Sequence, residues 1–154
     1  LRWNADRTEL ALADSHSRDL VAAGELALDA DGRFLAIRVR AEANYGAYVS
    51  MFAPSIPTTG MAKVISGLYR IPAIRIDFDC VFTNTVPVDA IRGAGKPEAN
   101  YITERAIEAA ARVIGRDPAD LRRQNLIASF PHRTAMGMAI DSARARSPRR
   151  SRCP

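Results

Sequence analysis

The chain has 154 residues, 47% of them hydrophobic and only 6% aromatic, and a formal net charge of +5. This length fits one globular domain or part of one, no apolar run is long enough to span a membrane, and so few aromatic residues disfavour a stacking platform for single-stranded nucleic acid. The charge surplus is local, because residues 143–154 contain five Arg and no acidic residue while residues 1–142 are neutral overall. Cys80 and Cys153 form no CxxC pair or disulfide framework, so we expect a reducing compartment, the cytoplasm.

Both ends of the chain are unusual. The N-terminal segment starts without Met in a charged stretch and has no signal-peptide core, which suggests that the chain is a fragment. Residues 143–154 form a low-complexity Ser/Arg/Pro run with nothing apolar enough to pack. We therefore divide the chain into a folded body, residues 1–142, and a disordered basic tail, residues 143–154. We interpret the tail as the product of a frameshift or truncated reading frame, with a genuine basic arm as the alternative.

The first predicted element is a β-hairpin. Residues 20–28 alternate imperfectly and residues 34–40 are apolar at alternate positions, and Asp31-Gly32 between them provides a turn in which Gly tolerates positive φ. The apolar residues of the second run are expected to share one buried face: Leu35, Ile37 and Val39.

The sequence changes character over residues 41–60. Pro54 and Pro57 predict a loop without a regular element, because proline lacks an N–H and restricts the residue before it. Tyr45 and Tyr48, ahead of the prolines, either line a substrate channel or pack within the core or the loop.

A further strand is predicted within residues 71–84. Its apolar residues alternate onto one face: Ile74, Ile76, Phe78 and Cys80. Its charged residues alternate onto the other face: Arg75, Asp77 and Asp79. This pattern is typical of a half-buried strand whose carboxylates are solvated rather than paired for catalysis.

Two helices are predicted towards the end of the body. The first runs from about Glu98 to Ile114, between Pro97 and Gly115, and the second follows Asp117 as N-cap and runs to Leu126. The apolar residues of the first recur at three- and four-residue steps: Ile102, Ala106, Ala109, Ala110 and Val113. The fold class expected from this order is α+β, a β-hairpin and mixed strands followed by two C-terminal helices.

Two further expectations concern the first of these helices. Three isoleucines on an otherwise Ala-rich helix predict apolar surface where other domains dock: Ile102, Ile107 and Ile114. Glu108 lies near Arg105 and Arg112 on the same helix and is expected to pair with one of them.

The candidate site is the turn Arg92-Gly93-Ala94-Gly95, between a strand and a helix N-terminus. Backbone N–H groups there lack intrahelical partners, and two glycines let the backbone come close to a ligand. Such a turn can hold an oxo group, a phosphate or a carboxylate. The motif is neither GxGxxG nor a P-loop, so a Gly-rich surface turn with an ion-paired Arg stays open as the alternative.

Four motifs follow one another along the chain: TNTVP at 83–87, RGAGKPEA at 92–99, ERAIEAAA at 104–111 and DPADLRRQNLI at 117–127. Together they resemble the molybdopterin-binding large subunit of the xanthine dehydrogenase and aldehyde oxidase family. The resemblance reaches upstream to Trp3, to residues 16–19 and to the hairpin turn, and covers about residues 1–142. It implies that this body is a fragment of the molybdenum-cofactor-binding domain.

The resemblance also implies a role for the turn. In that family the matching loop faces the molybdenum centre, and the backbone N–H at the Arg92 position hydrogen-bonds an oxygen on the metal. Arg92, Gly93, Ala94 and Gly95 are therefore expected to bind the molybdenum–molybdopterin cofactor. Family members hydroxylate an aldehyde or an N-heterocycle with oxygen from water, and pass electrons to 2Fe-2S and FAD groups on partner domains or subunits.

Two residues of the turn bear on the substrate. Ala94 stands where xanthine-oxidising members have an aromatic residue, which argues against purines. Gly93 stands where copper-containing carbon monoxide dehydrogenases have a cysteine, which argues against carbon monoxide. The sequence does not choose among the remaining aldehydes and N-heterocycles.

Other parts of the family's site are missing from this chain. The general-base glutamate and most pterin-binding loops lie C-terminal to it in the family, so we expect no catalytic residue and no metal ligand here, and no activity from the chain alone. The expected partners are the rest of the large subunit and the iron–sulfur and FAD subunits, with no membrane. The alternatives are a small basic nucleic-acid-binding protein that uses the Arg tail, which the neutral body disfavours, and an inactive remnant.

Overall fold

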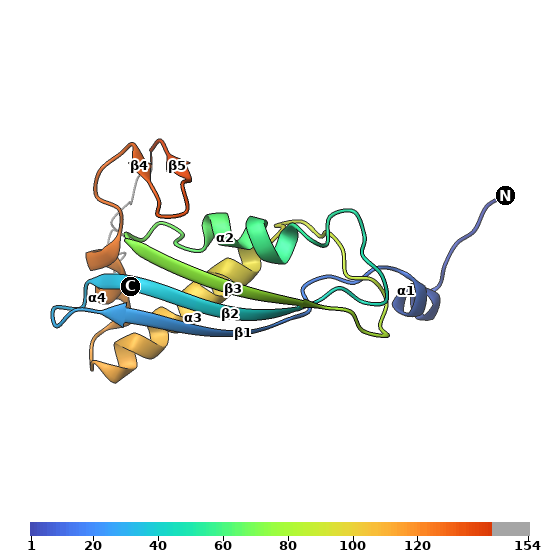
Figure 1. The fold of residues 1–154 in the computed structure, drawn as a ribbon, viewed down its shortest axis with the longest axis horizontal. Coiled ribbons are helices and arrows are strands. Elements are labelled where there is room, and N and C mark those ends of the chain that lie inside the picture. The colour runs from blue at the N-terminus through green and yellow to red at the C-terminus, as the bar shows by residue number, and fades with distance from the viewer. Residues whose placement is uncertain (143–154) are drawn as a thin grey trace, which may run out of the picture.

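A three-stranded sheet forms the centre of the fold in the computed structural model, which describes residues 1–142 (Figure 1). Strands β1 (Leu20–Leu28) and β2 (Phe34–Asn44) form the predicted antiparallel hairpin, and β3 (Ala73–Val81) pairs with β2 in parallel. The mixed sheet with its helices confirms the predicted α+β class. The predicted basic tail, with its frameshift and nucleic-acid interpretations, lies outside the described residues.

Helices cover one face of this sheet. Helix α3 (Lys96–Val113) runs along that face, and α4 (Pro118–Asn125) lies at the hairpin-turn end (Figure 1). The core between the sheet and the helices consists mainly of aliphatic side chains that are almost fully buried: Ile37, Val39, Met61, Ile65, Ile107 and Leu121. The opposite face is exposed and carries the charged residues of the strands, and there Arg38 pairs with Glu25 at 2.7 Å. The sheet therefore has one buried and one solvated side, as its alternating sequence requires.

The expectation for Leu35 is wrong, because the hairpin contains a β-bulge. Leu28 pairs with Phe34, whereas Ala27 pairs with Ala36, so Leu35 has no partner in the register. The extra residue shifts the alternation, which leaves Leu35 46% exposed and buries Phe34 together with Ile37.

The segment 41–60 is also more regular than predicted. Strand β2 continues to Asn44, and a π-helical turn η1 (Ile56–Gly60) leads directly into α2 (Met61–Val64). Pro57 lies in the first turn of η1, where a missing N–H breaks no helical hydrogen bond. Proline here begins a helical segment instead of preventing one.

Helix α3 begins two residues before the predicted start, and its buried stripe is rotated from the predicted one. The buried residues are Ala99, Ile102, Thr103, Ile107 and Ala111. Ala109 and Val113 are exposed instead. The isoleucines therefore offer little docking surface, because Ile102 and Ile107 belong to the core and only Ile114 is exposed.

A polar network joins α3 to α4 and to the segment after α2. Arg122 of α4 donates to Glu104 at 2.7 Å and to Glu108 at 2.8 Å, and Tyr69 donates to the other oxygen of Glu104 at 2.8 Å. Burial and the bond to Glu104 raise the pKa of Tyr69. Glu108 thus pairs with Arg122 rather than with Arg105 or Arg112, since α4 folds back against α3.

Asn125 ties α4 to the hairpin. It is buried, its Oδ1 accepts from the Phe34 N–H at 2.8 Å, and its Nδ2 donates to the carbonyl oxygens of Gly32 at 3.0 Å and Leu121 at 2.9 Å. Gln124 donates to the Asp31 carbonyl oxygen at 2.9 Å. The helix therefore satisfies backbone groups of the hairpin turn that no strand partner reaches.

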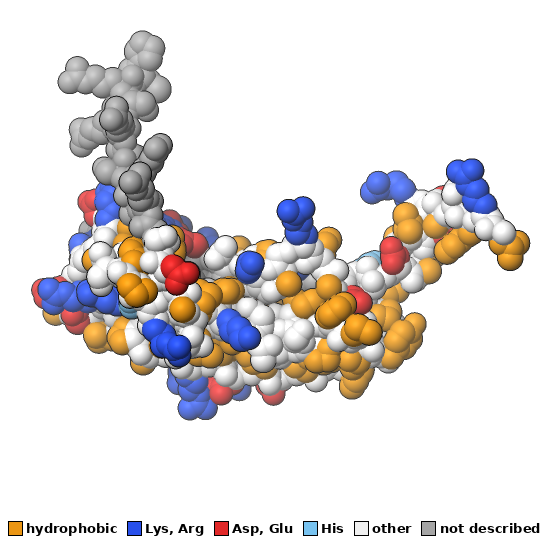
Figure 2. Space-filling view, turned by 90° about the horizontal axis from the view of Figure 1, so that it is seen from above, with side chains coloured by type: hydrophobic (Ala, Val, Ile, Leu, Met, Phe, Trp, Pro, Cys, Tyr) orange, Lys and Arg blue, Asp and Glu red, His pale blue; other side chains and the backbone are white. Residues whose placement is uncertain are grey.

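The remaining elements lie outside this core. Helix α1 (Arg7–Ala13), which the sequence analysis did not predict, has no buried residue and stands at the end of the molecule away from α4 (Figure 1). Exposed hydrophobic side chains gather towards that end (Figure 2): Tyr48, Met51, Phe52 and Phe82. Strands β4 (His132–Arg133) and β5 (Ala139–Ile140) form a separate two-stranded ribbon. No helix within residues 1–142 is long and apolar enough to cross a membrane.

Candidate functional site

Asn44, the last residue of β2, organises the segment that leads from β3 to the turn. Its Nδ2 donates to Asp19 at 2.7 Å and to the Thr85 hydroxyl at 3.1 Å, while its Oδ1 accepts from the Thr83 hydroxyl at 2.8 Å and from the Gly46 N–H at 2.7 Å. The two threonines of the TNT motif therefore attach this segment to the end of the sheet.

The turn itself has a left-handed backbone over three consecutive residues. The φ angles are 114° at Gly93, 43° at Ala94 and 88° at Gly95. Hydrogen bonds from the Ala94 N–H to the Ile91 carbonyl, at 3.1 Å, and from the Lys96 N–H to the Gly93 carbonyl, at 3.1 Å, close it. Helix α3 begins directly after Gly95, so the turn lies at a helix N-terminus as predicted.

The glycines of the turn have a packing role that the sequence does not indicate. A Cβ on Gly95 would lie 2.5 Å from the Ile56 carbonyl oxygen and 2.6 Å from the Met61 backbone nitrogen, and a Cβ on Gly93 would lie 2.9 Å from the Pro97 ring. They allow the chain to approach its own neighbours, η1, α2 and Pro97. The close contact positions the turn against the start of α2.

Several donors and charges of the turn have no partner. Within residues 1–142, nothing accepts a hydrogen bond from the N–H groups of Arg92, Gly93 or Gly95. The side chains of Arg92 and Lys96 are exposed and form no ion pair within the same range. Free N–H groups in a turn at a helix N-terminus, with cations beside them, favour an anionic or oxo ligand.

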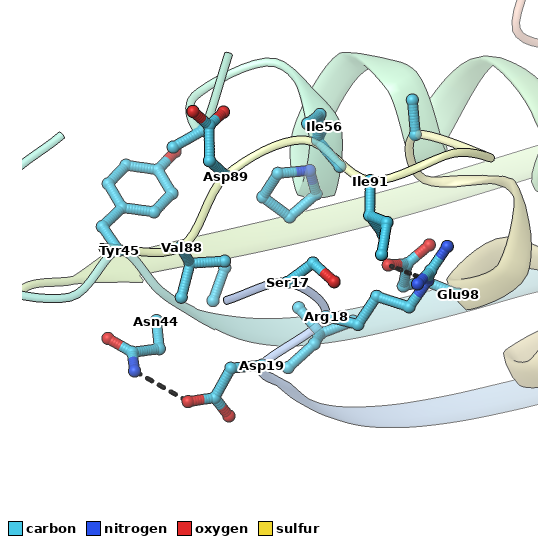
Figure 3. Close-up of a pocket in the computed structure, with 15 residues that line it drawn as sticks. Ser17, Arg18, Asp19, Asn44, Tyr45, Ile56, Val88, Asp89, Ile91 and Glu98 are labelled. Carbon is cyan, nitrogen blue, oxygen red and sulfur yellow. Dashed lines mark hydrogen bonds and ion pairs between the residues drawn. The ribbon is translucent and has the colours of Figure 1, made fainter. Parts of the chain in front are cut away.

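Arg18 and Glu98 lie behind the turn. Arg18 Nη2 donates to the Arg92 carbonyl oxygen at 2.6 Å, and its Nε is 3.7 Å from Oε1 of Glu98 (Figure 3). Glu98, in the first turn of α3, has a side chain that is only 10% exposed. Its other carboxylate oxygen is buried and has no partner within the described residues.

A small cavity of about 20 Å³ separates this pair from the end of the sheet, and Figure 3 shows the side chains around it. Its wall includes Arg18, Asn44, Tyr45, Asp89 and Ala94. The volume suits a single water molecule. Burial raises the pKa of Tyr45 to about 12, and this side chain lines the cavity, whereas Tyr48 is exposed.

The structure brings the four predicted residues together in one turn, with Arg92 and Ala94 exposed and Gly95 buried. Their contact with a cofactor stays a prediction. No local sequence pattern indicates the pair of Arg18 and Glu98 as part of the site, because the contact between Arg18 and Arg92 joins residues 74 positions apart. Within residues 1–142, no three or more His, Cys, Asp or Glu side chains are grouped to hold a metal ion.

The fold and the turn thus define an α+β domain whose Gly-rich turn carries backbone N–H groups without an acceptor in residues 1–142. The family model of a molybdopterin cofactor-binding domain matches residues 1–126. The gamma subunit of the 6-hydroxypseudooxynicotine dehydrogenase complex of Paenarthrobacter nicotinovorans is 37% identical over 127 residues, 82% of this chain and 16% of that protein. The carbon monoxide dehydrogenase large chain of Hydrogenophaga pseudoflava is 33% identical over 146 residues, 92% of this chain and 18% of that protein.

Solved structures agree with these relatives. Quinoline 2-oxidoreductase from Pseudomonas putida 86 matches with a TM-score of 0.84 at 32% identity, over 90% of this chain and 18% of the other. The chain belongs to the molybdopterin-binding large-subunit family of the xanthine and carbon monoxide dehydrogenases, which are molybdenum oxidoreductases, and this confirms the resemblance seen in the sequence. It spans less than one fifth of the length of these relatives.

Proposed function

We propose that the chain is part of the large subunit of a molybdenum hydroxylase, and that the turn Arg92–Gly95 hydrogen-bonds an oxygen on the molybdenum of a bound molybdopterin cofactor. One observation supports this most: the N–H groups of Arg92, Gly93 and Gly95 have no acceptor within residues 1–142. An oxo ligand only accepts hydrogen bonds, so the free N–H donors of the turn are matched to it. The donor set therefore fits the cofactor.

The bound cofactor would supply oxidation of an aldehyde or N-heterocycle with oxygen from water. The residues of this chain would bind and orient it. The backbone donors of the turn would face the metal's oxygen, and the exposed Arg92 and Lys96 would add positive charge nearby. Ala94, within the turn, has a short side chain and offers no aromatic surface on which a purine would stack. Relatives named after nicotine and quinoline support an N-heterocyclic substrate.

The complete reaction needs more than this chain. We propose that the general-base glutamate and most of the pterin-binding loops lie in the rest of the large subunit, and that the 154-residue chain has no turnover alone. Its share of less than one fifth of the relatives' length supports this. We further propose 2Fe-2S and FAD on partner subunits, which the relative from a multi-subunit dehydrogenase complex supports, and a location in the cytoplasm.

Molybdate, a tetrahedral oxoanion, tests the turn directly. In a nitrogen-15-labelled chain, we expect millimolar molybdate to shift the amide resonances of Arg92, Gly93 and Gly95. Gly137 is the internal control, because it also has positive φ, 80°, but its N–H already donates to the Thr134 carbonyl at 2.9 Å. Sodium chloride at equal ionic strength controls for screening. Unmoved turn amides, or equal movement at Gly137, would overturn the proposed role of the turn.

A further inference from the structure

One strained residue lies in the turn, and a second one donates a hydrogen bond to the turn. Within residues 1–142, Arg18 with φ 62° and Ala94 with φ 43° are the non-glycine residues with positive φ. This conformation is unfavourable for an L-amino acid, because its Cβ approaches a carbonyl oxygen. The two are connected, since Arg18 donates to the carbonyl oxygen of Arg92, two residues before Ala94. Strain concentrated at one place favours the hypothesis that this geometry serves function.

The backbone near Arg18 is fastened to the segment that enters the turn. The His16 N–H donates to the Pro87 carbonyl oxygen at 3.0 Å, and the Asp89 N–H donates to the His16 carbonyl oxygen at 2.7 Å. This short parallel bridge between His16 and Val88 holds the two segments side by side. The Arg18 side chain is thereby aimed at the turn, as Figure 3 shows for its contact with Glu98.

Glu98 holds the guanidinium from the other side. Its Oε1 lies 3.7 Å from Arg18 Nε, and its Oε2 is buried without a partner in the described part of the chain. Glu98 lies in the first turn of α3, where an acidic side chain is favourable, and its carboxylate interacts with Arg18 through Oε1.

We propose that Arg18 is a positioning residue that orients the donors of the turn, an inference that rests on the proposed function. A trans peptide unit is planar, and its C=O and N–H point in opposite directions. By binding the Arg92 carbonyl oxygen, Arg18 therefore fixes the direction of the Gly93 N–H. Arg18 lies directly against this peptide unit, since a Cβ at Gly93 would be in van der Waals contact with Arg18 Nη2 at 3.4 Å.

The geometry requires a guanidinium rather than any positive charge. Arg18 uses Nη2 for the carbonyl oxygen of Arg92 and Nε for the carboxylate of Glu98, two separate nitrogens in one rigid plane. A lysine ammonium has a single nitrogen and no plane. Arg18→Lys should therefore keep the charge and lose the orientation.

The test compares the labelled full chain with Arg18→Gln and Arg18→Lys, and with Arg38→Gln as the matched control. Arg38 also pairs with a glutamate, Glu25, but on the exposed face of the sheet. The Gly93 amide shift reports the hydrogen bond at the Arg92 carbonyl, because both belong to one peptide unit. Hydrogen exchange at the Ala94 and Lys96 amides, which close the turn, reports its rigidity.

In Arg18→Gln we expect the Gly93 amide resonance to be displaced. The hydrogen-exchange rates of the Ala94 and Lys96 amides and the half-saturating molybdate concentration should each rise about tenfold, because the loss of one charge-assisted hydrogen bond corresponds to about this factor. Arg18→Lys should also displace the Gly93 resonance, and Arg38→Gln should match the wild type. Circular dichroism checks that each variant is folded. If Arg18→Gln does not fold, the comparison of Arg18→Lys with the wild type decides.

The positioning role would be overturned if folded Arg18→Gln had the same Gly93 amide resonance and the same amide exchange rates as the wild type. The same result in Arg18→Lys would also overturn it. These readouts need no anion, so they separate this inference from the proposed function. If molybdate moves no turn amide of the wild type while Arg18 still controls the Gly93 shift, the proposed function fails and the orienting contact stands. If molybdate binds the wild type and Arg18→Gln equally, the proposed function stands and the positioning role fails.

Discussion

Gly95→Ala tests whether close contact with η1 and α2 positions the turn. The backbone at Gly95 has φ 88°, and a new Cβ would lie 2.5 Å from the Ile56 carbonyl oxygen and 2.6 Å from the Met61 nitrogen. The left-handed conformation costs an alanine about 1–2 kcal/mol, and forcing extra volume into packed surroundings costs about 1–3 kcal/mol more. We therefore expect the free energy of unfolding to fall by about 2–5 kcal/mol, measured by urea unfolding followed by circular dichroism.

Gly115→Ala provides the matched control. Gly115 follows α3 with φ 65°, and a Cβ there would meet nothing within 4 Å. Gly115→Ala should therefore lower the free energy of unfolding only by the cost of the left-handed conformation, about 1–2 kcal/mol. The difference between the two variants isolates the close approach. Equal losses of stability would refute the argument that Gly95 is required by its contact with η1 and α2.

Three further predictions follow from other parts of the chain. Asn125→Ala should lower the free energy of unfolding by about 3 kcal/mol, because it leaves buried backbone groups of the hairpin without a hydrogen-bond partner. The control Asn100→Ala, on the exposed surface of α3, should change the free energy of unfolding by less than about 0.5 kcal/mol. Urea unfolding of both variants measures the difference. Folding holds the Tyr45 proton more tightly, with a pKa of about 12 against an ordinary 10.0, so its contribution to stability is complete below pH 10 and is lost as the pH rises towards 12. Urea midpoints across that range should fall less steeply in Tyr45→Phe; equal slopes would contradict this. Finally, the purified chain should retain no stoichiometric molybdenum after dialysis, and a one-to-one ratio of metal to protein by elemental analysis would contradict the proposal that most cofactor contacts lie elsewhere.

Local signals explain which elements were predicted correctly. Three signals each act over a few residues: the Asp-Gly turn, the alternating run that ends at Cys80, and the Pro and Gly residues that border α3. The β1–β2 hairpin, strand β3 and helices α3 and α4 were therefore predicted near their true bounds. Leu35 and Pro57 were misjudged because a bulge and a π-helical turn depend on how neighbouring segments pack. The same holds for Glu108, whose partner Arg122 lies on another helix.

The sequence by itself determined the family, through four ordered motifs, and the place of Arg92–Gly95 between a strand and a helix. The tertiary structure alone decided what surrounds the turn: the close contact of Gly95 with Ile56 and Met61, and the bonds of Arg18 to Arg92 and Glu98. The physical reason is distance along the chain. A turn and a helix start depend on adjacent residues, whereas the orientation of a peptide group depends on a side chain 74 positions away.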